Sequence, residues 1–288
     1  MPSVPNTTQQ QPPPATQQSR AGRDLPAAVG VAVVLLTMLL TGLFLYPPVV
    51  AMLAGAAAAL GVYEVCRALE HGGIKIPITP AVVGAAVMPL AAFLGGAEAL
   101  LIATVVVSLV VIMVRVFGPK QGMVLSVMGA LFALTWVALC LSLLVLLFRT
   151  EQGGAKVLTV ILMAVGNDTF GYFAGVLFGK HPMAPRISPK KTWEGFAGSM
   201  FGSMILASIL VVVMLDSPWW HGPILAFCLV WVAALGDFAE SMVKREIGVK
   251  DMGTLLPGHG GVMDRIDSIV FVAPVGYVVF ELLQIFQG

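Results

Sequence analysis

Apolar runs long enough to cross a membrane follow one another along most of this chain. A helix needs about 20 apolar residues to span the hydrocarbon core of a bilayer. Cutting the chain at its charged residues, glycine pairs and prolines gives nine runs of about that length. The predicted spans are residues 26–46, 48–68, 77–94, 97–117, 123–148, 157–178, 195–215, 219–240 and 266–286.

The runs are apolar on every side, which indicates helices. A transmembrane β-strand would alternate apolar and polar residues. Lipid also supplies no hydrogen-bond partners, so each span must satisfy its own backbone groups. The pattern therefore predicts an all-α polytopic integral membrane protein with about nine transmembrane helices. The third predicted span is the shortest and contains Pro89.

Composition supports the same class. Charged residues make up 11% of the chain and hydrophobic residues 58%, whereas a soluble domain has about a quarter of its residues charged. A water-soluble globular protein is therefore excluded. The three cysteines, Cys66, Cys140 and Cys228, are widely spaced within or beside apolar runs, which predicts neither a disulfide framework nor a metal site.

The chain divides into three parts. Residues 1–24 are rich in Gln, Pro, Thr and Ser without apolar periodicity, and we expect a disordered tail. Residues 25–156 contain the first five spans. Residues 157–288 contain the last four spans and the polar motifs, and we expect this part to be catalytic.

The distribution of basic residues predicts the orientation. With the N-terminal tail in the cytoplasm, 14 of the 16 Lys and Arg residues fall on the cytoplasmic side, as the positive-inside rule requires. Arg149 and Lys156 fall on the other side. The tail and both basic clusters of the C-terminal half are therefore expected to face the cytoplasm.

Asn167 and Asp168 lie near the middle of the sixth span. An ionised carboxylate in lipid costs several kcal/mol, so Asp168 is expected to face a polar cavity or a cation. The alternative is a hydrogen-bonding pair that only joins two helices.

A basic loop precedes the seventh span. It contains Lys180, Ser188, Lys190 and Lys191. Cations, hydroxyls and the free N–H groups of a helix N-terminus together form a good phosphate site. The charges alone fit an ordinary basic loop that fixes orientation.

Polar residues also recur at the end of the eighth span. Asp237, Glu240, Ser241, Lys244 and Arg245 are three or four residues apart, so several can share one helical face. An internal ladder of salt bridges is the alternative.

A last polar group precedes the ninth span. His259 is followed by Gly260 and Gly261, whose backbone N–H groups can approach an anion closely. Asp264 and Asp267 are three residues apart and can offer two oxygen ligands to a hard cation. Together, the four groups predict a cytoplasm-facing polar cavity for metal-dependent phosphoryl or nucleotidyl transfer.

The stretch from Ser241 to Asp267 resembles the signature of the phosphatidate cytidylyltransferases, or CDP-diacylglycerol synthases. The matching residues are Ser241, Lys244-Arg245, Lys250-Asp251, Gly253, Pro257, His259-Gly260-Gly261 and Asp264-Arg265-Ile266-Asp267. The residues around Asn167-Asp168, Lys180 and Ile187–Gly195 resemble a second block of the same family. The resemblance covers the C-terminal half; the first five spans share only their hydrophobicity with the family.

The resemblance implies the reaction of CTP with phosphatidic acid to give CDP-diacylglycerol and pyrophosphate. It also implies a requirement for Mg²⁺, and it allows a second cation. The implied metal ligands are Asp168, Asp237 and Asp264. The implied catalytic residues are Asp237, Lys244, Arg245, Asp264 and Asp267. The implied substrate-binding residues are Asn167, Lys180, Ser188, Lys190, Lys191, Ser241, Lys250, His259, Gly260, Gly261 and Arg265.

We expect membrane lipids around the helices, no nucleic-acid partner, and a bacterial inner membrane as the location. The resemblance also makes a homodimer plausible. An ion-coupled transporter is the alternative from another class, because Asp168 lies within a span and the helices are interrupted by glycines. Another Mg²⁺-dependent lipid-phosphate transferase is a further alternative, although the Asp-Gly-x-x-Ala-Arg pattern of CDP-alcohol phosphatidyltransferases is absent from the sequence.

Overall fold

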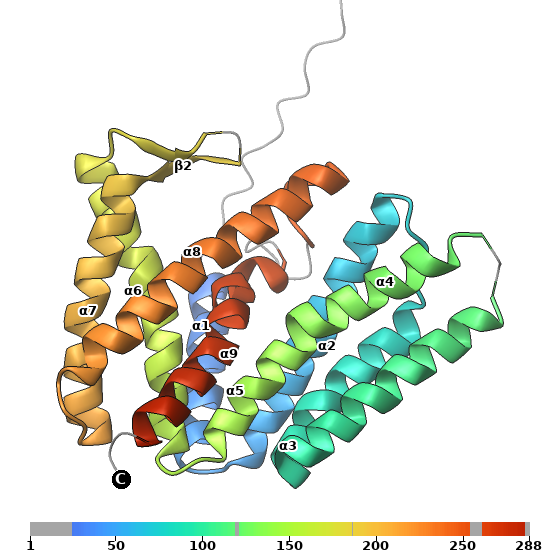
Figure 1. Ribbon diagram of the computed structural model, residues 1–288, viewed down its shortest axis with the longest axis horizontal. Coiled ribbons are helices and arrows are strands. Elements are labelled where there is room, and N and C mark those ends of the chain that lie inside the picture. Colours follow the sequence, from blue (N-terminus) through green and yellow to red (C-terminus); the bar gives the residue numbers. More distant parts are fainter. Residues whose placement is uncertain (1–24, 119–120, 186, 254–260, 286–288) are drawn as a thin grey trace, which may run out of the picture.

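The computed structural model describes residues 25–118, 121–185, 187–253 and 261–285, and its described part is a helical bundle with one short β-hairpin (Figure 1). The all-α expectation is confirmed. The helices are α1 (Leu25–Phe44), α2 (Pro48–His71), α3 (Ile78–Val116), α4 (Met123–Ala133), α5 (Cys140–Phe148), α6 (Gly153–Phe178), α7 (Trp193–Leu215), α8 (His221–Ile247) and α9 (Met263–Ile285).

Among the described residues, seven helical segments are long and apolar enough to cross a membrane, and a shorter apolar helix covers Val29–Phe44. One of the seven is Met123–Phe148, in which α4 and α5 are joined by the π-helical segment η1 (Leu134–Leu139). The prediction of a polytopic membrane protein is therefore confirmed.

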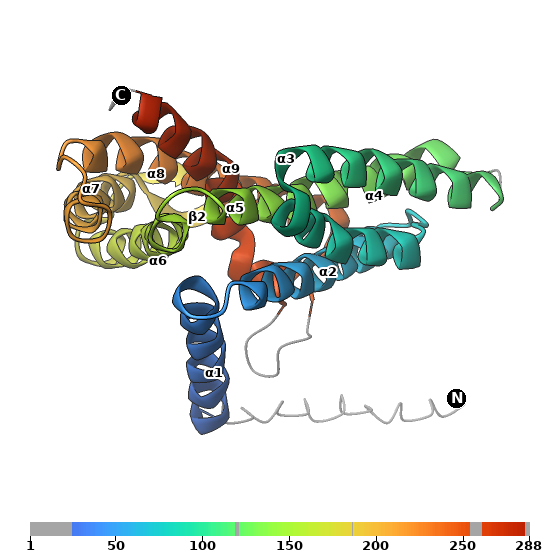
Figure 2. The same cartoon turned by 90° about the horizontal axis from the view of Figure 1, so that it is seen from below.

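The helix α3 folds back on itself at Gly96. This residue has φ 72° and ψ −154°, a region of the backbone map that is essentially restricted to glycine. A Cβ on Gly84 would lie 2.2 Å from the Val107 side chain, so the two arms of α3 run side by side. Figure 2 shows the resulting hairpin. Arg149 stabilises the turn by donating a hydrogen bond from Nη1 to the Ala92 carbonyl at 3.0 Å.

Small residues bring α6 and α7 into close contact. A Cβ on Gly198 would lie 2.1 Å from the Ala174 Cβ, and one on Gly195 would lie 3.0 Å from the Gly171 carbonyl oxygen. Membrane helices pack through such small residues because their backbones can then approach closely. The connection between α6 and α7 forms the antiparallel hairpin of β1 (Pro182–Ala184) and β2 (Ser188–Thr192).

The helices α8 and α9 extend further than the apolar pattern predicted. The eighth predicted span ends at residue 240, whereas α8 continues to Ile247 and ends at Gly248, which has φ 78° and closes the helix in the left-handed conformation. The start of α9 at Met263 places Asp264 in its first turn. The motif residues Lys244 and Arg245 therefore belong to α8, and Asp264 belongs to α9.

Two apolar clusters form the interior. The first joins α2, α3, η1 and α5 with the start of α9, including Val62, Met88 and Met263. The second joins α5 to α8 with the rest of α9, including Leu225 and Val272. The helix α9 therefore contributes to both, and Figure 1 shows it between the two groups of helices. The helix α1 projects away from this bundle (Figure 2), and Val29 to Leu36 are exposed along it.

Candidate active site

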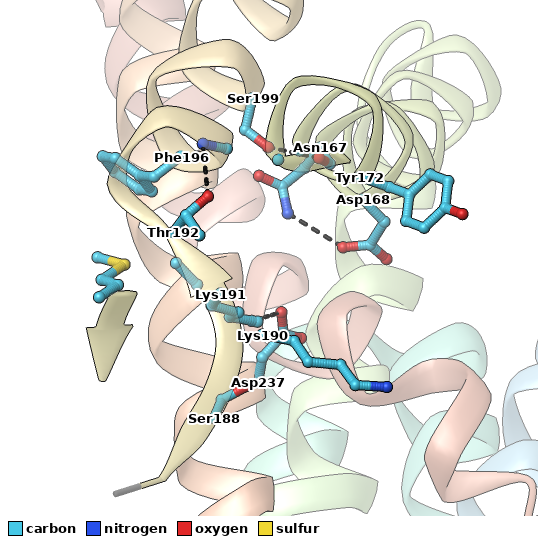
Figure 3. A pocket seen from close by; sticks show the side chains of 15 residues that line it. Asn167, Asp168, Tyr172, Ser188, Lys190, Lys191, Thr192, Phe196, Ser199 and Asp237 are labelled. Carbon is cyan, nitrogen blue, oxygen red and sulfur yellow. Dashed lines mark hydrogen bonds and ion pairs between the residues drawn. The ribbon is translucent and has the colours of Figure 1, made fainter. Parts of the chain in front are cut away.

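A pocket of about 330 Å³ lies where α6, α7 and α8 meet the β-hairpin (Figure 3). Apolar surface from Tyr172, Met183 and Phe196 shares its lining with polar side chains. We call this the α6–α7 pocket. Its polar lining residues are Asn167, Asp168, Ser188, Lys190, Lys191, Thr192, Ser199 and Asp237.

Asn167 and Asp168 form one wall of the pocket. Asn167 Nδ2 donates to Asp168 Oδ1 at 3.1 Å, while the Asn167 carbonyl accepts a hydrogen bond from Ser199 Oγ at 2.5 Å. Asn167 is buried and Asp168 is exposed to the pocket. The Asp168 carboxylate therefore faces the pocket. The bond that joins α6 to α7 here uses the Asn167 backbone carbonyl, and the two paired side chains contact each other within α6.

Lys191 of β2 forms an ion pair with Asp237 of α8 across the pocket (Figure 3). The other oxygen of Asp237, Oδ1, accepts a hydrogen bond from Ser268 Oγ of α9 at 3.0 Å. The Asp237 carboxylate of α8 therefore contacts one side chain from β2 and one from α9.

Hydrogen bonds to the first turn of α7 hold both ends of the β-hairpin that carries Lys191. Thr192 caps α7 by accepting a hydrogen bond from Gly195 N at 3.1 Å, the usual role of a threonine before a helix. Glu194 Oε2 accepts hydrogen bonds from the backbone N–H groups of Lys180 and His181, each at 3.1 Å. These bonds attach the residues before β1 and the last residue of β2 to the first turn of α7.

A second pocket of about 430 Å³ adjoins the first and is strongly basic. We call it the basic pocket. Lys190 and Ser188 belong to both pockets, so the two share a wall formed by β2. The basic pocket is lined by Ile187, Ser188, Lys190, Ser241, Lys244, Arg245, Val249 and Lys250.

Lys244 connects the basic pocket to the acidic side chains of α8 and α9. Its Nζ lies 2.8 Å from Glu240 Oε1 and 2.5 Å from Asp264 Oδ1. Glu240 is 2% exposed, and removing Lys244 would leave its buried carboxylate without that cation. Within α8, Lys244 pairs with Glu240, whereas Asp237 at the other end of the predicted ladder pairs with Lys191 of β2, and Lys244 also reaches α9.

Asp264 holds the backbone on both sides of the segment 254–260. Its carboxylate accepts hydrogen bonds from Gly261 N at 3.0 Å and from Met252 N at 3.3 Å. His259 and Gly260 lie outside the described residues. Gly261 is buried beside Asp264.

The carboxylates suit a hard cation in their chemistry. Asp168 and Asp237 line the same pocket, so two like charges face one space there. A divalent cation would relieve this repulsion, and carboxylate oxygens are the ligands that Mg²⁺ prefers. In the part of the chain that the structure describes, no three acidic, His or Cys side chains converge closely enough to hold one ion.

Two expected substrate-binding residues lie apart from the pockets. Lys180 is exposed, and its contribution to the hairpin comes from its backbone N–H. Arg265 is exposed and is not among the residues that line either pocket. Asp267 also lines neither pocket, and its Oδ1 accepts a hydrogen bond from its neighbour Ser268 N at 2.7 Å.

The sequence reasoning missed several residues that shape the site. Ser199 and Ser268 hold its walls, but nothing in the sequence distinguishes them from other serines in apolar helices. Glu64 of α2 accepts a hydrogen bond from Met263 N at 2.8 Å, next to Asp264. The signal for Glu64 was present, because an acidic residue within a membrane span is expected to have a function.

Comparison with known proteins extends the likeness over nearly the whole chain. The model of the cytidylyltransferase family matches residues 26–283. A phosphatidate cytidylyltransferase of Mycobacterium bovis is 38% identical over 283 residues, which cover 94% of this chain and 92% of that protein. The one from Mycobacterium leprae is 36% identical over 280 residues, covering 92% and 90%. The one from Thermotoga maritima is 39% identical over 158 residues, covering 53% and 58%.

These matches confirm the resemblance that the signature indicated. They also include the first five predicted spans, for which the sequence offered only hydrophobicity. The chain therefore belongs to the cytidylyltransferase family, and within it to the phosphatidate cytidylyltransferases.

Proposed function

We propose that this chain transfers the cytidylyl group of CTP to phosphatidate, giving CDP-diacylglycerol and pyrophosphate. The observation that carries the proposal is the shared wall between a partly apolar pocket and a basic pocket. Such a pair suits one substrate with acyl chains and another with a triphosphate. Membership of the family supports the same reaction.

The basic pocket is the proposed site of the triphosphate. Lys244, Arg245 and Lys250 line it together with Ser241. Fixed cations in a protected site stabilise charge that develops on the transferring and leaving phosphates. Arg265, although it is exposed, and the glycines 260 and 261 remain proposed phosphate contacts.

The α6–α7 pocket is the proposed site of the phosphatidate headgroup. Lys190, Lys191 and Ser188 would hold its phosphate there, near Asn167. Tyr172, which lines this pocket, is 68% exposed on the apolar outer surface of α6. The acyl chains could therefore remain in the bilayer while the headgroup enters between the helices.

In the proposed reaction, a phosphatidate oxygen attacks the α-phosphorus of CTP. The bond from the α-phosphorus to the oxygen that bridges it to the β-phosphate breaks, and that oxygen leaves as part of pyrophosphate. A phosphate monoester is already largely ionised at neutral pH, so no strong general base is required. His259 is accordingly proposed to contact phosphate or to position its segment.

Asp237 and Asp264 are the proposed holders of Mg²⁺, with Asp168 and Asp267 as further ligands or neighbours, and a second cation is compatible with this acidic group. When bound, Mg²⁺ would neutralise charge on the phosphates and orient them. Lys191 and Lys244 neutralise Asp237 and Asp264 in the structure. They are therefore placed to move from a carboxylate to a phosphate when substrate and metal bind.

We further propose nine transmembrane spans. The two arms of α3 would each cross the membrane and meet at the Gly96 turn, and α1 would add another span. The basic pocket would then face the cytoplasm. The N-terminal tail predicted for residues 1–24 lies outside the described residues. A bacterial inner membrane and a homodimer remain part of the proposal. So does the division into a supporting part, residues 25–156, and a catalytic part, residues 157–288.

The test is conversion of phosphatidate and labelled CTP to CDP-diacylglycerol by the purified protein in detergent, with Mg²⁺ and then with EDTA. We expect product with Mg²⁺ and none with EDTA. A folded protein that forms no product would contradict the proposal, and movement of a solute across sealed vesicles without CTP cleavage would favour a transporter. Product made from preformed CDP-diacylglycerol and an alcohol would favour another transferase.

A further inference from the structure

Glu64 is a buried acidic residue in the half of the chain that carries none of the signature. It lies in α2 and is 1% exposed, and Val62, Val65 and Cys66 around it are completely buried. A carboxylate in such surroundings is costly unless it is held by polar partners. Its position therefore needs an explanation beyond packing.

The partners of Glu64 belong to the start of α9. Glu64 Oε2 accepts a hydrogen bond from the backbone N–H of Met263 at 2.8 Å. This N–H lies in the first turn of α9, where no helical carbonyl is available to accept from it. The bond joins two residues that are 199 positions apart.

The same carboxylate lies against the two glycines that flank the segment 254–260. A Cβ on Gly253 would be 2.3 Å from Glu64 Oε1, and a Cβ on Gly261 would be 2.7 Å from Glu64 Oε2. The same Cβ on Gly261 would also lie 2.8 Å from the backbone nitrogen of Gly253. Glycine is required at both positions because a side chain would collide with Glu64.

Asp264 contacts the same backbone segment as Glu64. Its carboxylate accepts from Gly261 N and Met252 N, and it pairs with Lys244 of the basic pocket. Met263 and Gly261 thus connect Glu64 to Asp264 through one short piece of backbone. Among the described residues, Glu64 Oε1 has no hydrogen-bond partner.

We propose that Glu64 is a positioning residue for cytidylyl transfer, which holds the first turn of α9 so that Asp264 and Lys244 keep their places. This inference rests on the proposed function. Glu64 lies behind the backbone of Gly253 and Gly261 and acts through Asp264. A displacement of about 1 Å at a reacting group can lower a rate about 10²-fold, which sets the size of the expected effect.

The variants are Glu64→Leu, which keeps most of the volume but has no acceptor, and Glu64→Gln, which keeps an acceptor oxygen. Val65→Ala is the matched control, because Val65 is equally buried in α2 and its truncation disturbs the same apolar cluster. The full-length protein is purified in detergent. Four quantities are measured: kcat, KM for CTP, thermal stability, and hydrogen exchange in peptides that cover residues 261–268.

We expect kcat of Glu64→Leu to fall about 10²-fold while KM for CTP changes less, since Arg245 and Lys250 would still line the basic pocket when Lys244 is displaced. Glu64→Gln should lose about two- to tenfold, because one acceptor oxygen can still serve Met263 N. Exchange at residues 261–268 should become faster in Glu64→Leu. Val65→Ala should lower thermal stability and leave kcat and this exchange unchanged.

Three results would overturn the proposal: wild-type kcat in Glu64→Leu, unchanged exchange at residues 261–268, or an equal loss of kcat in Val65→Ala. If Glu64→Leu does not fold, Glu64→Gln decides, since wild-type kcat and exchange in that variant would contradict the proposal. A wild-type protein that makes no CDP-diacylglycerol would refute the proposed function. The exchange result would still report whether Glu64 holds α9.

Discussion

Lys191 of the β-hairpin and Asp237 of α8 form an ion pair, although 46 residues separate them in the chain. The pair closes the α6–α7 pocket on the side where the basic pocket begins, because Lys190 next to it belongs to both pockets. Asp237 is also held from α9 by Ser268. A change at either partner therefore affects both proposed substrate sites.

Replacing Lys191 by Met should lower kcat/KM for CDP-diacylglycerol formation about 10²- to 10³-fold, the usual cost of losing one preorganised group that stabilises charge. Steady-state kinetics with both substrates varied would measure it. Lys75→Met is the control, because Lys75 is exposed in the connection between α2 and α3. Equal activity of the two variants would remove Lys191 from the mechanism.

Asp264→Asn should lower turnover at least about 10²-fold in a protein that is folded and inserted. The amide keeps the size of the carboxylate but loses the charge that pairs with Lys244 and that is proposed to hold Mg²⁺. Turnover is measured over a range of Mg²⁺ concentrations. The control is Asp216→Asn, since Asp216 has φ 47°, a conformation that asparagine adopts readily. Near-normal turnover of Asp264→Asn would disprove the metal assignment.

Gly198→Val should destabilise the protein by about 1–3 kcal/mol, because added volume in a closely packed interface forces the helices apart. The Cβ would meet Ala174 at 2.1 Å, and the displacement would widen the α6–α7 pocket. Thermal unfolding in detergent and KM for phosphatidate are the measurements. Gly30→Val should have little effect, since nothing lies within 4 Å of a Cβ at Gly30. Similar stability of the two variants would contradict the observed packing.

Gly96→Ala should cost about 1–3 kcal/mol of stability, because a Cβ strains a backbone at φ 72° and ψ −154°. It would also lie 3.0 Å from Arg149 Nη1, which stabilises the turn. Gly122→Asn provides the comparison, since Gly122 has φ 69° and ψ 18°, where asparagine is tolerated. Denaturation midpoints of the purified variants test the difference, and an unchanged midpoint for Gly96→Ala would count against the tight turn.

The apolar pattern predicted the helices well because lipid demands long apolar segments wherever a helix crosses. It even separated the two arms of α3, since the Gly95-Gly96 pair interrupts the run. It did not predict β2, because Ser188–Thr192 forms a strand through its pairing with Pro182–Ala184. Pairing between segments is a property of the folded chain, and no local pattern reveals it.

The sequence motifs identified the residues of the site, but they did not predict which of these residues form ion pairs with one another. Asp237, Lys191, Lys244 and Asp264 were all singled out, yet their pairing depends on how α8 and α9 pack against the hairpin. Glu64 was not predicted, because it lies in α2 and the family signature covers only residues of the C-terminal half. Its link to Met263 arises only when α2 and α9 come together.

The position of α9 in both apolar clusters has a consequence for biogenesis. During synthesis, α9 is made after every helix with which it packs, so neither cluster is complete when those helices enter the membrane. Until α9 is made, the earlier helices lack the side chains that it adds to each cluster. The carboxylates of Asp237 and Glu64 also lack their hydrogen-bond donors Ser268 and Met263 until then, so the same helix completes both the interior and the site.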